Sequence, residues 1–189
     1  MVRSGLMVRG EQLLHLAKRF FQSLSKDPPA EVDDRWIRSQ LLPGETALWE
    51  RLSAPDQRHA VQVARTLLRA RPDAPRPVIA AAVLHDVGKV VSGYGTIGRV
   101  AATVFWVLVP RSIKGGVAHR WSGGDGFGRK RLVQRLAEYR LHPELGRDLL
   151  VDAGSDPLTS NWAAEHHTPS DRWTVSVEWG AVLKECDDD

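Results

Sequence analysis

The chain has 189 residues, which suits one domain, or one domain with a short appendage, and allows a sizeable buried core. Hydrophobic residues make up 42% of it and charged residues 26%, an ordinary globular composition. The net charge of +3 gives no strong signal for a nucleic-acid or membrane partner. Because Cys186 is the only cysteine, no intramolecular disulfide can form, and we expect a reducing compartment.

The apolar segments of the chain are short. Glu11, Gln12, Lys18 and Arg19 interrupt the first apolar stretch, so it contains no continuous signal-peptide core. The most apolar window, residues 100–109, has about half the length that a helix needs to cross a bilayer. We therefore expect a cytoplasmic protein without a transmembrane segment.

Residues 1–44 are expected to form a helical extension that packs on a main domain of residues 45–189. Apolar residues recur at helical spacing over residues 9–24, and Asp27-Pro28-Pro29 then stops that helix. The same helix is basic and amphipathic, so binding to a membrane surface or to a partner is the alternative interpretation.

The main domain is predicted to consist of helices. Asp56 is a good N-cap for a helix that runs to about Arg71. Residues 78–87 are almost all apolar, as in a helix that is buried on most sides. Further helices are expected over 130–139, 143–153 and 157–167.

The last segment admits two structures. Residues 173–179 alternate like a strand, whereas Ser176 could cap a helix from Val177 to about Asp187. No partner strand is evident elsewhere in the sequence, so we predict an extended stretch followed by that helix. The predicted fold class is all-α.

His85 and Asp86 stand side by side near the end of the apolar run 78–87. Adjacent helical residues lie about 100° apart around the axis, so both can reach one metal ion, or the carboxylate can bridge two. Burying Asp86 with neither a metal nor a cationic partner would be costly. Imidazole nitrogen and carboxylate oxygen together suit divalent manganese, iron, zinc or nickel.

The order His59, then His85-Asp86, then Asp187 resembles the HD superfamily of metal-dependent phosphohydrolases, which is named for the dyad. The chain is most similar to the HD-GYP branch, where HDxGK is followed by HPxxG, an adjacent His-His pair and a late aspartate. The matching segments are His85 to Lys89, His142 to Gly146, His166-His167 and Asp187. The resemblance covers residues 55–189 and implies an HD-domain helical bundle.

This resemblance also implies two metal positions that share one carboxylate. The first would be formed by His59, His85, Asp86 and Asp187, and the second by Asp86, His142, His166 and His167. One member of the His-His pair could instead contact phosphate, and His142 could be a helix-capping residue. Lys89 would contact a substrate phosphate oxygen, so Asp86 and Lys89 are the implied catalytic residues. One or two bound ions would acidify a water molecule and offset charge on the phosphoryl oxygens of a phosphomonoester or phosphodiester, such as a nucleotide.

The chain departs from the branch after its His-His pair. Residues 168–173 read TPSDRW, where the branch has a glutamate followed by DGxGYP. The GYP element is tied to cyclic-di-GMP recognition, so the identity of the substrate does not carry over. The late aspartate also has two neighbours, Asp188 and Asp189. Asp187 is preferred because Leu183 lies one turn earlier on the same helical face and because Cys186 is small.

Residues 111–135 form a second candidate site. This window is basic and rich in glycine, with Arg120 and Arg129 flanking the glycines. Such a segment could be a lid or a phosphate clamp that uses these arginines, or a solvated loop.

Two other functions remain open. The chain could be a non-catalytic HD-type regulatory or nucleotide-binding module, or an HD-type oxygenase with a mixed-valent di-iron pair. Lys89 and the basic window favour a phosphorylated substrate over dioxygen. The apolar run 97–109 is either part of the core or the surface of a homodimer.

Overall fold

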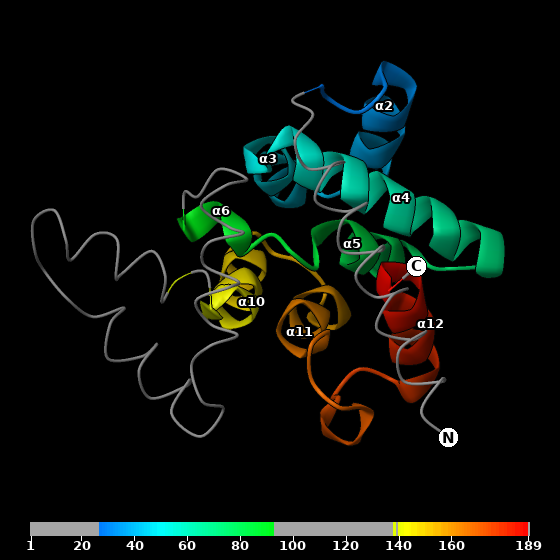
Figure 1. Ribbon diagram of the computed structural model, residues 1–189, viewed down its shortest axis with the longest axis vertical. Coiled ribbons are helices and arrows are strands. Elements are labelled where there is room, and N and C mark those ends of the chain that lie inside the picture. Colours follow the sequence, from blue (N-terminus) through cyan, green and yellow to red (C-terminus); the bar gives the residue numbers. More distant parts are fainter. Residues whose placement is uncertain (1–26, 93–137, 139, 189) are drawn as a thin grey trace, which may run out of the picture.

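A computed structural model describes residues 27–92, 138 and 140–188. Every regular element in these ranges is a helix, which confirms the predicted all-α class (Figure 1). The elements are α2 (Glu31–Gln40), α3 (Pro43–Arg51), α4 (Ala54–Ala70), α5 (Arg76–Leu84), α6 (Lys89–Ser92), α10 (His142–Asp152), α11 (Pro157–Glu165), the 3-10 helix η1 (Ser170–Arg172) and α12 (Val177–Asp188).

Several expected features lie outside the described residues. These are the helix over 9–24, the apolar run 97–109, the basic window 111–135 with Arg120 and Arg129, and all but residue 138 of the helix over 130–139. Among the helices that the structure does describe, none is both long and apolar enough to span a bilayer.

Helix α4 presents one apolar face to the core. Ala60, Val63, Ala64 and Leu67 recur three, four and seven residues apart, and each is at least 98% buried. The prediction that Asp56 caps this helix is wrong, because the helix begins two residues earlier with Pro55 in its first turn. Proline fits there because its missing N–H would have no partner within the helix.

Helix α5 is the central helix. Its residues from Val78 to Leu84 are all buried, and it contacts α4, α11 and α12. It ends at Leu84 instead of reaching Val87 as predicted, and residues 85–88 form a turn. Within this turn Val87 N donates to Leu84 O at 3.0 Å. His85 and Asp86 therefore lie in the turn that directly follows the central helix.

A tight connection joins α10 to α11. Gly154 has φ of 74°, Gly154 N donates to Val151 O, and Ser155 N donates to Leu150 O, both at 3.0 Å. This is a Schellman motif, which ends α10 with a glycine in the left-handed region. Asp156 then caps α11 by accepting a hydrogen bond from Leu158 N at 2.8 Å. The two helices pack against each other along their lengths (Figure 1).

The helix predicted for the last segment is confirmed, whereas the stretch before it, predicted to be extended, has bends at Thr174 and Val175. No strand lies in residues 173–176, and α12 follows from Val177 to Asp188. Ser176 Oγ accepts a hydrogen bond from Trp179 N at 3.4 Å, as an N-cap side chain does. Gly180 faces the ring of Trp173, where a Cβ atom would lie 2.5 Å from the indole. Helix α12 packs on α4 and α5, and Asp187 Oδ1 near its carboxyl end lies 3.4 Å from Nε2 of His85, the residue that follows α5.

Helices α2 and α3 pack on α5 at the opposite side of the bundle from α12 (Figure 1). Ile37 and Trp49 are fully buried, and Trp49 Nε1 donates to Asp34 Oδ1 at 2.8 Å. Helix α3 runs across residue 44, the expected boundary between the extension and the main domain.

Glu45 on α3 forms an ion pair with Arg76 on α5. Its replacement tests the packing of these helices. Its side chain is fully buried, and Oε2 accepts hydrogen bonds from Leu42 N at 2.8 Å and from an Arg76 guanidinium N–H at 2.9 Å. We expect Glu45→Ala to lower the free energy of unfolding by about 2 kcal/mol, because both donors lose their acceptor and a cavity remains. Urea denaturation followed by circular dichroism measures this loss. Glu50→Ala, on the same helix but exposed, should change stability by less than about 0.5 kcal/mol, and equal losses would refute the assigned role.

Candidate metal centre

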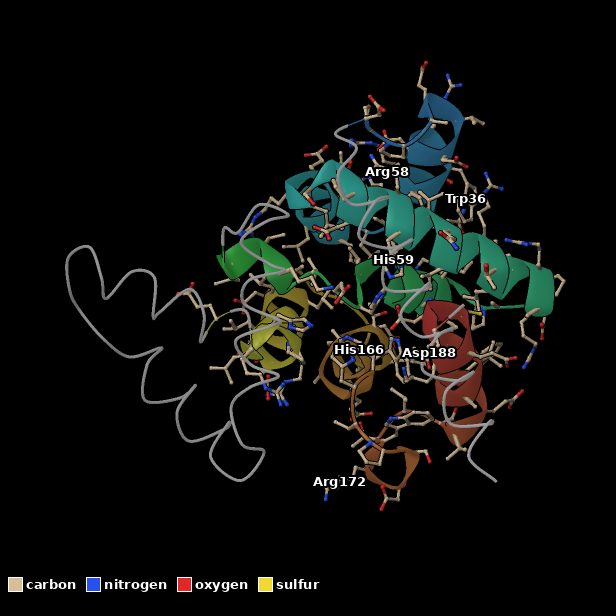
Figure 2. All side chains as sticks on the ribbon, viewed as in Figure 1. Trp36, Arg58, His59, His166, Arg172 and Asp188 are labelled. Atoms are coloured by element: carbon tan, nitrogen blue, oxygen red, sulfur yellow. The ribbon has the colours of Figure 1, made fainter. Side chains whose placement is uncertain are left out.

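The fold brings histidines and aspartates from several elements to the centre of the bundle. They are His59 on α4, His85 and Asp86 in the turn after α5, His142 at the start of α10, His166 and His167 just after α11, and Asp187 near the end of α12. In Figure 2, His59 and His166 both lie near the centre of the helices, whereas Arg172 lies at the periphery.

Asp86 lies in the middle of this cluster. Its Oδ1 atom is 3.4 Å from His142 Nε2 and 3.7 Å from His166 Nε2. Its Oδ2 atom is 3.5 Å from His85 Nε2 and forms an ion pair with Lys89 Nζ. The two carboxylate oxygens therefore face different histidines.

Asp187 joins the cluster from α12. Its Oδ1 atom is 3.0 Å from His59 Nε2 and 3.4 Å from His85 Nε2. The next residue points elsewhere: Asp188 pairs with Lys184 at 2.6 Å, and its side chain is 62% exposed. One step along a helix turns a side chain by about 100°, and here that step separates the buried carboxylate of Asp187 from the exposed one of Asp188. The structure thus brings Asp187, and not Asp188, to the histidines, whereas Asp189 lies outside the described residues.

Two ligand groups can be defined among the described residues. The first ligand group is His59, His85 and Asp86, and the second ligand group is Asp86, His142, His166 and His167. Within each group the donor atoms lie no more than 4.8 Å apart, close enough to surround one metal ion. Asp86 belongs to both groups, so each group could hold one ion and the Asp86 carboxylate could contact both ions.

Helix ends orient two of the imidazoles. His85 Nδ1 bonds to Ala82 O, and His166 Nδ1 bonds to Ala163 O, each at 2.9 Å. A carbonyl oxygen only accepts hydrogen bonds, so each Nδ1 carries a proton and each Nε2 is left for a metal ion or a second proton. These carbonyls are among the last ones of α5 and α11, which have no partner within the helix. Such backbone contacts typically fix the rings of metal-binding histidines.

The chemistry of the donor set fits a cation. His85 Nε2, Asp86 Oδ1 and His166 Nε2 are buried and make no hydrogen bond within the described part of the chain. Their nearest oppositely charged partners lie 3.4–3.7 Å away, which is longer than a good hydrogen bond, so a cation among them would satisfy all three. Their mutual proximity and their inward Nε2 atoms are what a divalent metal ion requires.

The electrostatics of the cluster also favour a bound cation. Burial lowers the pKa of His85, but Asp86 and Asp187 outweigh it and raise the pKa to about 10. Two carboxylates therefore favour a positive charge at this imidazole, which either a proton or a metal ion can supply. Burial opposes ionisation of Asp86, yet Lys89 and His85 hold the pKa of its carboxyl well below the usual range.

The pKa values of the two histidines in the His-His pair shift downward, in contrast to that of His85. Burial and nearby histidines lower the pKa of both His166 and His167 below the ordinary imidazole value. Although His167 is exposed on one side, its ring centroid lies 3.9 Å from that of His166, so the two rings disfavour each other's charge. Both imidazoles are therefore neutral near pH 7, which is the form that binds metal.

One residue close to the site had no signal in the sequence. Glu165 precedes the His-His pair, and its carboxylate accepts hydrogen bonds from Thr174 N at 2.8 Å and from Thr174 Oγ1 at 2.6 Å. Its carbonyl oxygen accepts a third hydrogen bond from Trp173 Nε1 at 3.2 Å. Glu165 thereby holds the segment that leads from the His-His pair to α12 and Asp187. Only its place before His166 could have drawn attention to it.

Comparison of the chain with protein-family models, with curated proteins and with solved structures found no significant match. The case for a function therefore rests on the arrangement of the cluster itself.

Proposed function

We propose that the protein is a metal-dependent phosphohydrolase of the HD type that cleaves a phosphomonoester or phosphodiester of a small molecule such as a nucleotide. The observation that carries this proposal is that Asp86 is shared by two histidine groups while its second oxygen pairs with Lys89. A shared carboxylate suits a pair of divalent ions, and an ammonium group beside it suits a phosphorylated substrate.

The residues would divide between two ions. The first ligand group together with Asp187 would hold one ion, and the second ligand group would hold the other. When bound, such ions supply a hydroxide nucleophile near neutral pH and offset negative charge on phosphoryl oxygens. The helix-end carbonyls of Ala82 and Ala163 accept from Nδ1 of His85 and His166, which leaves each Nε2 atom to bind an ion if one were present. This arrangement reduces the reorganisation that metal binding requires.

Lys89 would bind the substrate phosphate. Its side chain is 20% exposed, so it lies between the buried carboxylate and solvent. A lysine ammonium has three N–H donors and can contact Asp86 and a phosphate oxygen together. Because dioxygen carries no charge for an ammonium to balance, Lys89 supports a phosphohydrolase over a di-iron oxygenase.

The first experiment measures metal content and hydrolysis together. Full-length protein is purified without chelator from cells supplied with manganese and iron, and its metal-to-protein ratio is determined by elemental analysis. We expect close to two ions per chain, and metal-dependent hydrolysis of bis(p-nitrophenyl) phosphate or p-nitrophenyl phosphate that EDTA removes.

Other outcomes would contradict the proposal in different ways. No bound metal, even after reconstitution, would exclude a metal-dependent enzyme. Bound metal with nucleotide binding by calorimetry but no hydrolysis of nucleotides or of the two model esters would favour the non-catalytic module. A ratio of one would confine the metal to a single ligand group.

A further inference from the structure

Two glycines mark a close crossing between the turn after α5 and the first turns of α10. A Cβ atom on Gly88 would lie 1.9 Å from His142 O and 2.7 Å from Gly146 N. A Cβ atom on Gly146 would lie 3.2 Å from Gly88 N. Neither glycine has a positive φ angle, so backbone conformation does not demand glycine here. The requirement is space, because any side chain would separate the two backbones.

This crossing is close in the chain to the shared carboxylate and to a residue of the second ligand group. Gly88 comes two residues after Asp86, and its nearest neighbour is the carbonyl of His142, a member of the second ligand group. Gly146 follows His142 by one helical turn, so both lie on the same face of α10. The separation of the two backbones therefore determines how far His142 Nε2 lies from Asp86 Oδ1, which is 3.4 Å.

Two of the residues proposed to hold the first ion come from neither the turn nor α10. His59 comes from α4, and Asp187, which contacts it, comes from α12. Both helices pack on α5 itself. Moving α10 away from the turn would thus displace His142 while leaving the contact between His59 and Asp187 in place.

We propose that the Gly88–Gly146 crossing positions a ligand of the second metal ion, an inference that rests on the proposed function. It holds His142 within reach of the carboxylate that the two ions share. Gly88 and Gly146 touch neither substrate nor metal in this proposal, and they act only through the backbone of His142.

The test uses three glycine-to-alanine variants of the full-length protein and manganese as the probe. Gly88→Ala introduces the severe clash at the crossing, and Gly146→Ala a milder one. Gly44→Ala is the matched control, because its Cβ would lie 2.3 Å from Ala153 O, at the far end of the same helix α10. Metal content, manganese affinity by calorimetry and the electron paramagnetic resonance signal of coupled manganese pairs are measured, with circular dichroism as the check on folding.

We expect Gly88→Ala to keep one manganese ion, to bind the second at least tenfold more weakly and to lose the coupled-pair signal. Gly146→Ala should weaken binding of the second ion by a smaller factor, since the Gly88 backbone, 3.2 Å from the new Cβ atom, has to move by only a few tenths of an ångström. Gly44→Ala should lower the melting temperature but retain both ions and the coupled signal. If Gly88→Ala fails to fold, Gly146→Ala decides the question.

Several results would overturn the inference. One is a folded Gly88→Ala or Gly146→Ala protein that binds both ions as the wild type does. Another is a Gly44→Ala protein that loses the second ion to the same extent, because general destabilisation would then explain the effect. A wild-type protein that binds only one ion would also overturn it. Failure of the proposed function is distinguishable, because the wild type itself would then bind no metal or hydrolyse nothing.

Discussion

Replacement of Asp86 by asparagine is expected to abolish hydrolysis and to remove metal from both ligand groups. Asp86 is the residue that the two groups share, and its Oδ1 and Oδ2 atoms face different histidines. An amide has nearly the same shape but cannot supply two anionic oxygens. If the loss of metal costs about 4 kcal/mol of transition-state stabilisation, the rate falls by about three orders of magnitude.

The measurement is the metal-to-protein ratio of Asp86→Asn, together with its turnover on whichever ester the wild type cleaves. Asp148→Asn is a suitable control, because Asp148 lies on α10 with its side chain 66% exposed and the substitution changes the same charge. The control should retain both metal and turnover. An Asp86→Asn protein that keeps two ions and full activity would show that the shared carboxylate is not a ligand.

Asp187→Asn is expected to have the next largest effect, and it selectively tests the first ligand group. The Asp187 carboxylate contacts both His59 and His85, and its side chain is 10% exposed. Loss of a residue that only supports a ligand typically costs 10–100-fold in metal affinity or activity. We expect at least about a 100-fold loss of affinity for the first ion, because Asp187 is placed to bind it directly.

Asp188→Asn provides the matched control on the next residue. It removes the same charge one position later, where the carboxylate pairs with Lys184 at the surface. Manganese titrations of the two variants should therefore differ sharply, with Asp188→Asn close to the wild type. Equal losses in both would mean that the negative charge of this end of α12 matters, and not the position of one carboxylate.

The helical fold could be predicted from the sequence because helix formation is largely encoded locally. The spacing of Ala60, Val63 and Leu67 and the unbroken apolar run around Val78 to Leu84 each require burial of a helix face. Helix ends were less predictable. The first turn of α4 contains Pro55, and α5 ends at Leu84, before the turn that meets α10 at Gly88.

The residue types and the order of the motifs predicted a metal site, because imidazole and carboxylate groups are suitable ligands for divalent ions. The sequence did not show which of these residues contact one another. His59 and Asp187 are 128 positions apart, and their 3.0 Å contact exists because α12 packs on α4 and both helices pack on α5.

The sequence by itself thus determined the all-helical class, which follows from local pattern, and it supplied the set of candidate metal ligands through the resemblance of its motifs to the HD superfamily. Only the tertiary structure decided that Asp187 faces the histidines while Asp188 faces solvent, that Asp86 belongs to two ligand groups, and that glycine is needed where the turn meets α10. All three depend on distances between segments that are far apart in the chain. They are set by how helices pack around a common core, and spacing along the sequence carries no measure of them.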